Sequence, residues 1–383
     1  MHEPTGLTTA EPVRKRVGFL ELFFDLVFVF AITQLVGLLH DDHSAQGWVR
    51  AAVLLWLVWW AWSQYTWAGN AIDLDRRATK LAVLAVTGAM LCAATAMPLA
   101  FGDRSLWFAL PYTAVRLAGL GLYWFGLRGD PDHRAALVTY LPVAVVSPAL
   151  VLAGGIVGGD AQLWWWSAAI AIDVVSVAAA GRGEFRVEPA HFAERHGLIV
   201  IIALGEAVIA AGSTAAEVGL VPSTASMLAA GFATTAAMWW CYFDWIHSAA
   251  ERRLVTEPDP RRRGHLARDL FTLGHLPIVA GIVLIAVAVE EGLVHPTDEL
   301  DRFATAALGL GIGLYLLGFV LGNLRATGRI LVGRVVALVA ATTWVAFAGP
   351  GVAAVVTVAG VAAAIVALAG VETRRRAAAA QAP

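Results

Sequence analysis

The sequence predicts an all-α, polytopic transmembrane helix bundle with about twelve spans. Of its 383 residues, 59% are hydrophobic and only 15% are charged, whereas about 25% of the residues in an ordinary soluble domain are charged. Apolar runs long enough to cross a bilayer recur along the whole chain. Lysine and arginine are concentrated in every second loop between these runs, a pattern typical of polytopic membrane proteins.

Twelve apolar runs are predicted to form the spanning helices because each is about 20 residues long. In chain order they cover residues 17–39, 48–70, 79–101, 106–127, 135–157, 161–180, 196–216, 225–246, 268–290, 303–323, 329–348 and 350–371. A polar segment, 1–16, precedes this transmembrane bundle (17–372), and a tail, 373–383, follows it. The first run contains acids and lacks a small-residue cleavage site, so we expect no cleaved signal peptide.

The basic residues of the loops predict the orientation of the bundle in the cell (cytoplasmic) membrane. They precede the first span and then follow every second span: Arg14, Lys15 and Arg16; Arg76, Arg77 and Lys80; Arg128 and Arg134; Arg182, Arg186 and Arg195; Arg252, Arg253, Arg261, Arg262, Arg263 and Arg268; Arg325 and Arg329; and Arg374, Arg375 and Arg376. The alternate loops contain few basic residues. We therefore expect both termini to be cytoplasmic.

Two tryptophan-rich runs point to an internal repeat. WWAWSQYTW begins at Trp59 and WWCYFDW begins at Trp239, and the same offset of 180 residues brings the first span close to the seventh. Six helices per half would give two parallel repeats, 17–181 and 182–372. The alternative is that tryptophan-rich helices resemble one another through composition alone.

The first apolar run, GFLELFFDLVFVFAITQ, carries two acids in its first turns. Glu21 and Asp25 are four residues apart, which places them about one turn apart on the same face of a helix. An ionised side chain that faces lipid is costly, so each acid is expected to face the interior of the bundle and to have a partner there. A structural pairing with Arg116, Arg195 or Arg334 is one explanation, and a functional site is the other.

Several further ionisable residues lie within or beside the predicted spans. They are Arg116, Asp173, Glu206, Asp244, His275 and Arg334, with Glu194, Arg195 and His196 at the cytoplasmic start of the seventh span. At 1.5 Å of rise per residue, Arg116 and Glu206 fall near the middle of the membrane and most of the others fall in its cytoplasmic half. The outer half of these helices contains few polar residues beyond Thr33, Gln34, Ser213 and Thr214. The sequence therefore predicts a polar site that opens to the cytoplasm.

The sequence contains only weak indications of a metal or cofactor site. The histidines lack the spacing of a zinc-binding helix, and Cys92 and Cys241 both lie inside apolar runs. Carboxylates can bind a hard cation, and Glu21, Asp25 and Asp244 are the candidate ligands if a metal is bound. No cofactor-binding motif is predicted. The net charge of −2 provides no basic footprint for a nucleic acid.

Four sequence blocks carry a resemblance to a known family. ELFFDLVFVFAITQ, ERHGLIVIIALGEAVIA, WWCYFD and GHLPIVAGIVL occur in that order and resemble the signature blocks of the bacterial low-temperature-requirement A (LtrA) family of membrane proteins. By position, the recurring polar residues of that family correspond to Glu21, Asp25, Glu194, Arg195, Glu206, Asp244 and His275. The family name records a growth phenotype, so the resemblance implies a membrane protein and leaves its chemistry open.

Three functions are compatible with these residues, and an enzymatic role stays undecided. In a proton- or cation-coupled transporter, Glu21, Asp25 and Glu206 carry the proton or cation, and Asp173, Asp244 and His275 relay it. Arg116, Arg195, Glu194 and His196 would then set the charge balance around a small ion.

The second function is an intramembrane enzyme acting on a lipid or isoprenoid such as a prenyl diphosphate. Mg²⁺ would be bound by Glu21, Asp25 and Asp244, while His275 or Glu206 would act as a base. The sequence lacks an aspartate-rich DDxxD repeat. The third function is a stress-response membrane protein without catalysis. The oligomeric state is not predicted.

Overall fold

The apolar runs form helices along nearly all of the chain that the computed structural model describes, which comprises residues 17–127, 129, 131–180 and 187–381. The predicted segment 1–16 and the basic residues Arg128, Arg182 and Arg186 lie outside the described residues. Within those ranges, the only β-type pairing is an isolated antiparallel bridge between Glu299 and Ala353. The predicted all-α class is therefore confirmed.

The first group of helices comprises the elements α1 to α7. Their bounds are α1 Phe19–Asp41, α2 Ala45–Ala71, α3 Arg77–Ala96, the 3₁₀ turn η1 Met97–Leu99, α4 Ser105–Leu127, α5 Pro131–Ala144, α6 Val146–Val157 and α7 Gly159–Ala180. The predicted span 135–157 is divided between α5 and α6, and Pro142 lies in the last turn of α5. Proline removes a backbone donor and breaks the regular helix.

The second group comprises α8 to α15. Their bounds are α8 Pro189–Val218, α9 Pro222–Cys241, η2 Tyr242–Ile246, α10 His247–Val255, α11 Pro260–Leu266, η3 Ala267–Leu273, α12 Gly274–Val294, α13 Arg302–Thr327, α14 Val332–Ala348 and α15 Ala354–Gln381. The segments η2 and η3 are π-helical. The predicted tail 373–383 continues α15 as far as Gln381.

Seven helical segments of the described chain are long and apolar enough to cross a membrane: Phe19–Asp41, Arg77–Leu99, Leu137–Val157, Pro189–Val218, Pro260–Val294, Arg302–Thr327 and Ala354–Ala378. The protein is therefore a multi-pass helical membrane protein. Each of the other predicted spans also coincides with a helix. The count of twelve crossings stays a prediction because those helices are shorter or less apolar, as in α2, which holds six tryptophans.

Local sequence signals fix several helix ends. Proline occupies the first helical position of α8, α9 and α11, where its missing N–H is not needed. The hydroxyl of Ser44 accepts a hydrogen bond from the Gly47 N–H (3.1 Å) at the start of α2. Asp301 caps α13 in the same way through the Ala304 N–H (2.6 Å). Gly328 ends α13 with φ of +69°, a conformation that glycine adopts without strain.

The helices of each group contact one another in the same order. In the first group, α1 contacts α2 and α3, and the series continues from α3 to α4, α6 and α7 and back to α2. In the second, α8 contacts α9 and α12, and the series continues from α12 to α13, α14 and α15 and back to α9. The contact order of the second group thus follows that of the first, and the two repeats 17–181 and 182–372 stay a prediction.

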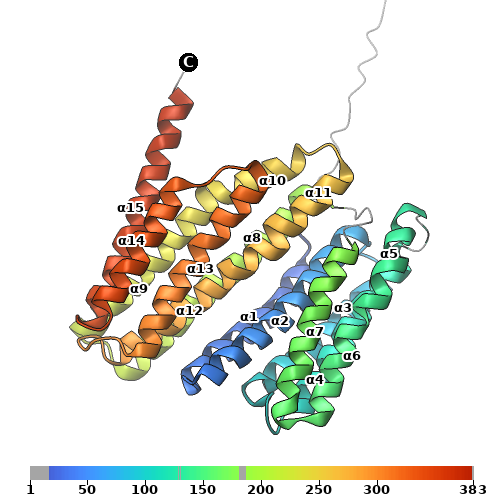
Figure 1. The fold of residues 1–383 in the computed structure, drawn as a ribbon, viewed down its shortest axis with the longest axis horizontal. Helices are drawn as coiled ribbons and strands as arrows, with labels where there is room; N and C mark the ends of the chain where they lie inside the picture. The colour runs from blue at the N-terminus through green and yellow to red at the C-terminus, as the bar shows by residue number, and fades with distance from the viewer. Residues whose placement is uncertain (1–16, 128, 130, 181–186, 382–383) are drawn as a thin grey trace, which may run out of the picture.

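The two groups meet in the centre of the molecule. There α1 contacts α8 and α12, and α2 contacts the same two helices. Figure 1 shows the blue helices α1 and α2 between the rest of the first group and the yellow and orange helices of the second. Residues far apart in sequence are thereby brought together, and the polar side chains of α1 and α8 lie at this junction.

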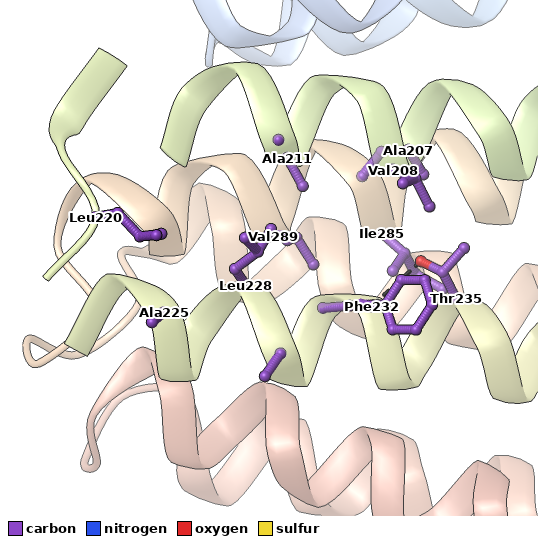
Figure 2. Close-up of a pocket in the computed structure, with 14 residues that line it drawn as sticks. Ala207, Val208, Ala211, Leu220, Ala225, Leu228, Phe232, Thr235, Ile285 and Val289 are labelled. Carbon is purple, nitrogen blue, oxygen red and sulfur yellow. Dashed lines mark hydrogen bonds between the residues drawn. The ribbon is translucent and has the colours of Figure 1, made fainter. Parts of the chain in front are cut away.

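A separate apolar pocket of about 460 Å³ lies between α8, α9 and α12. Figure 2 shows Ala207, Ala211, Leu228, Phe232, Ile285 and Val289 around it. Thr235 is its one lining residue with a polar side chain. The exposed rings and aliphatic groups at its rim, such as Phe232 and Leu220, indicate a surface that faces lipid.

Candidate functional site

The first turns of α1 and α8 lie side by side and contribute two polar residues each. Glu21 and Asp25 lie on α1, and His191 and Arg195 lie on α8. Each pair is separated by four residues, which aligns its members on one helical face. All four side chains are buried, with at most 5% of any residue exposed. We call these four residues the inner cluster.

Glu21 is held by contacts on both sides. His191 Nε2 lies 3.0 Å from its Oε2 atom, and Arg195 Nη1 lies 3.5 Å from its Oε1 atom. The Gly18 backbone N–H donates a hydrogen bond to Oε2 (3.0 Å), so Glu21 also stabilises the start of α1. Gly69 of α2 leaves room for this carboxylate, because a Cβ atom at that position would lie 2.9 Å from Oε1.

Asp25 is the more deeply buried acid, with no exposed surface. Arg195 Nη2 donates a hydrogen bond to its Oδ1 atom (2.8 Å), and the indole Nε1 of Trp62 donates a second to the same atom (2.9 Å). The guanidinium carbon of Arg195 also lies 5.8 Å from the centroid of the Trp62 ring. Arg195 is therefore the counter-ion of both acids.

The inner cluster retains unused hydrogen-bonding capacity. Among the described residues, Asp25 Oδ2, His191 Nδ1 and Arg195 Nε have no hydrogen-bond partner although all three atoms are buried. Leaving a buried polar atom unpaired is costly. The Asp25 oxygen can accept a proton or bind a cation, and the neutral His191 imidazole can accept a proton at its unprotonated nitrogen, whereas Arg195 Nε can only donate a hydrogen bond.

The formal charges of the inner cluster do not cancel. With both carboxylates ionised and the imidazole of His191 neutral, two negative charges face the single positive charge of Arg195. One proton on His191 or on a carboxylate would bring the sum to zero. A buried net charge is expensive in a low-dielectric environment, so this arrangement favours uptake of one proton or cation.

A second set of buried groups adjoins Asp25 through Trp62. The rings of Trp62 and His196 meet edge to face with centroids 5.0 Å apart, and those of His196 and His275 are 5.2 Å apart. His275 Nδ1 donates to the Leu270 carbonyl (3.0 Å), since a carbonyl can only accept. Its Nε2 atom is therefore free to accept from the Tyr242 hydroxyl (2.8 Å).

His196 has the same tautomer but lacks the second partner. Its Nδ1 atom donates to the Phe192 carbonyl (2.9 Å), and its buried Nε2 atom has no partner among the described residues. Two π-helical segments border this region: Tyr242 begins η2, and Thr272 in η3 accepts a hydrogen bond from Trp59 Nε1 through its carbonyl (2.8 Å). π-Helical turns occur frequently at functional sites.

Glu206 lies apart from the inner cluster, in the opposite half of the bundle. Its carboxylate faces the Thr33 hydroxyl of α1 and interacts electrostatically with Glu290 of α12. His40 Nδ1 lies 2.7 Å from Glu291 Oε1 at the same end. We call Thr33, Glu206, Glu290, Glu291 and His40 the outer group. Few polar residues were predicted there, because Glu290 ends the predicted span 268–290 and Glu291 begins the loop that follows it.

A buried apolar layer separates the inner cluster from the outer group. It contains Phe28 and Ile32 of α1, Val200 and Ala203 of α8, and Ile282 of α12. Asp25 and Thr33 are eight residues apart, which corresponds to about 12 Å along the helix. Polar side chains therefore occupy both ends of the α1, α8 and α12 junction, with no charged group between them on these helix faces.

Arg116 and Asp173 form an independent ion pair in the first group of helices. Arg116 Nη2 lies 3.0 Å from Asp173 Oδ1, and both side chains are fully buried. Gln64 accepts from Arg116 Nε (2.7 Å), and the Tyr112 hydroxyl accepts from Nη1 (2.9 Å). These contacts connect α2, α4 and α7. The pair is thus best explained as a structural link rather than a part of the inner cluster.

Asp244 and Glu194 do not join the inner cluster either. Asp244 is exposed and pairs with Arg376 of α15, while Glu194 is exposed and accepts a hydrogen bond from the Val17 N–H (3.2 Å). The three candidate metal ligands are consequently not assembled. In the part of the chain that the structure describes, no three His, Cys, Asp or Glu side chains are arranged to hold a metal ion.

Two members of this site escaped the sequence reasoning. His191 precedes Arg195 by one helical turn in PAHFAERHG, and that spacing was the available signal. Trp62 lies in the run WWAWSQYTW, which was interpreted only as evidence for an internal repeat. Its hydrogen bond to Asp25 depends on the contact between α1 and α2, which no local pattern encodes.

Comparison with known proteins identifies the family. The family model for the bacterial low temperature requirement A protein (LtrA) matches residues 16–371. An uncharacterized protein of Rhizobium meliloti (strain 1021) is 32% identical over 330 residues, which cover 82% of this chain and 79% of that protein. No solved structure matches. The chain belongs to the LtrA family.

Proposed function

We propose that this LtrA-family protein is a proton- or cation-coupled transporter whose inner cluster binds the coupling ion. In this proposal both termini are cytoplasmic, as the basic loops predict. Glu21, Asp25, His191 and Arg195 then lie in the cytoplasmic half of the membrane. The outer group lies in the opposite half.

The uncompensated charge of the inner cluster carries the proposal. Two buried carboxylates share one guanidinium, with Arg195 Nη2 at 2.8 Å from Asp25 Oδ1 and Nη1 at 3.5 Å from Glu21 Oε1. A purely structural ion pair would need only one acid for each arginine, as in Arg116 and Asp173. Buried ionisable residues in membrane spans often mark proton or ion pathways.

The position of the cluster supports a transport cycle. Sites of many transporters lie where two repeats meet, and access alternates when one repeat rocks against the other. Here α1 and α2 of the first group contact α8 and α12 of the second. A rocking motion at this junction would change the hydration of the apolar layer between the inner cluster and the outer group.

Each residue has a distinct role in this mechanism. Asp25 and Glu21 exchange the proton or cation, and His191 holds the alternative proton position beside Glu21. Arg195 fixes the two carboxylates and sets the charge balance. The imidazoles of His196 and His275, which adjoin Asp25 through Trp62, stay neutral. Glu206 receives or releases the ion on the outer side.

Proton flux in proteoliposomes tests the proposal. The purified chain is reconstituted with the pH dye pyranine inside the vesicles, and a potassium diffusion potential set by valinomycin provides the driving force. We expect proton uptake that falls to the level of protein-free vesicles in Glu21→Gln and in Glu206→Gln, because each change removes an ion-exchanging carboxylate.

The matched control is Glu217→Gln, which removes an exposed acid from the same helix as Glu206 and should leave the flux unchanged. Addition of Na⁺ or Mg²⁺ to one side, at a fixed K⁺ gradient, distinguishes proton from cation coupling. Flux that persists in both Glu21→Gln and Glu206→Gln would reject the transporter proposal.

A further inference from the structure

A groove of about 620 Å³ lies on the surface between η3, α12 and α13, at the end of the bundle that is predicted to be cytoplasmic. It is distant in sequence from the inner cluster and shares no residue with it. The groove is lined by Leu273, Pro277, Gly318, Leu321, Asp269 and Arg325, among others. Its lining is apolar along one part and charged at one end.

The apolar part of the groove is exposed on the surface of two helical segments that could span a membrane. Leu273 is 37% exposed and Leu321 is 52% exposed, although both lie in helices that are apolar enough to span a membrane. Gly318 lets α12 and α13 approach closely, because a Cβ atom there would lie 2.7 Å from the Ile278 side chain, whereas a Cβ atom on Gly322 would meet nothing closer than 3.7 Å. An extended hydrocarbon chain is the ligand that matches the apolar part of this groove.

The charged end carries a net positive charge. Arg268 Nε donates a hydrogen bond to Asp269 Oδ1 (2.6 Å), and Arg325 Nε donates to Asp269 Oδ2 (2.8 Å). Two guanidinium groups therefore share one carboxylate, which leaves one positive charge. The side chain of Arg325 is 68% exposed, and its Nη groups make no hydrogen bond to the described residues.

We propose that this groove binds one anionic phospholipid. The acyl chain lies along Leu273 and Leu321, and the phosphate accepts hydrogen bonds from the Nη groups of Arg325. Guanidinium groups bind phosphate through paired N–H donors, and Arg325 lies in the last turn of α13, at the depth of the lipid headgroups. This site is independent of the transport proposal.

Lipid binding to the purified full-length chain tests the inference. Native mass spectrometry is used to count phosphatidylglycerol and phosphatidylcholine molecules bound after delipidation in detergent. We expect one molecule of phosphatidylglycerol to bind more tightly than phosphatidylcholine. Arg325→Gln should weaken phosphatidylglycerol binding about fivefold, since one basic residue beside anionic lipid contributes about 1 kcal/mol.

Two matched controls identify the groove as the site. Arg302→Gln removes an exposed arginine from the opposite end of α13 and should not change binding. Leu321→Trp should weaken binding of the lipid by covering the groove, whereas Leu310→Trp changes a similarly exposed leucine of α13 and should not. Thermal unfolding verifies that every variant is folded.

Three results would overturn the inference. They are equal binding of phosphatidylglycerol and phosphatidylcholine, equal losses in Arg325→Gln and Arg302→Gln, and displacement of the lipid by millimolar inorganic phosphate alone. The first two would indicate general attraction to headgroups. The third would indicate an anion site without a role for the acyl chain. None of them bears on proton flux.

Discussion

Replacing Arg195 with glutamine perturbs the inner cluster most directly, because within the described residues it is the one arginine or lysine that pairs with the two buried acids. It donates to Asp25 at 2.8 Å and lies 3.5 Å from Glu21. Glutamine retains a polar amide of smaller size and removes the charge. In Arg195→Gln, Glu21 and Asp25 would face each other without a counter-ion.

The expected loss of unfolding free energy in Arg195→Gln follows from the burial of Arg195 and Asp25. Arg195 is 1% exposed and Asp25 is fully buried, so solvent screens their interaction little. Breaking such a pair by removing one partner typically costs about 3–5 kcal/mol because a buried charge is left uncompensated. At acidic pH the carboxylates take up protons instead, so the loss of stability in Arg195→Gln should shrink as the pH falls.

The assay is equilibrium unfolding in mixed micelles, in which the sodium dodecyl sulfate fraction is increased and helicity is followed by circular dichroism. The double variant Asp25→Asn with Arg195→Gln removes one charge of each sign and should be more stable than Arg195→Gln by at least about 1 kcal/mol. Arg76→Gln breaks an exposed pair with Asp73 and should cost less than about 1 kcal/mol.

Two outcomes would refute this reasoning. If Arg195→Gln is as stable as the native chain at neutral pH, the acids are not ionised partners of the guanidinium. If the double variant is no more stable than Arg195→Gln, the loss comes from packing of the arginine side chain and not from its charge.

Three further predictions concern packing and topology. Gly69→Ala should destabilise the protein by about 1–3 kcal/mol, because its Cβ atom would lie 2.9 Å from Glu21 Oε1; Gly88→Ala, which has open space around it, should be neutral or stabilising in the same unfolding assay. Arg116→Gln should cost about 3–5 kcal/mol and leave the proton flux per folded molecule unchanged, since the Arg116 and Asp173 pair is structural; a flux lost from folded protein would contradict this role. In a cysteine-free background, an impermeant maleimide added to intact cells should label Ser44→Cys and Asp160→Cys but not Arg76→Cys or Thr256→Cys, and the reverse pattern would invert the predicted orientation.

The sequence predicted the class of the fold and named Glu21, Asp25 and Arg195 of the inner cluster, but it did not predict which residues pair. Glu21 and Asp25 were identified because acids in an apolar run need partners. Three arginines were candidates for that partner, and choosing Arg195 required the contact between α1 and α8. Depth along the helices placed both Asp173 and Asp25 in the same half of the membrane, but their helices lie in different parts of the bundle.

Other differences arise from contacts at the ends of helices. Asp244 pairs with Arg376 because α15 continues to Gln381, about ten residues beyond the predicted end of the last span. Glu290 and Glu291 of the outer group were missed because α12 extends to Val294 and thereby carries both residues on helical turns. Local propensity describes a helix interior better than its boundary.

Infrared difference spectroscopy tests the central claim, which is that the inner cluster takes up a proton. The purified chain is recorded in lipid films as the pH is lowered over the range in which proteoliposomes show flux. We predict a carboxylic acid or imidazolium band that is lost in one of the variants Asp25→Asn, Glu21→Gln or His191→Gln and retained in Glu217→Gln. A spectrum in which none of these three substitutions alters the pH-dependent bands would contradict the account.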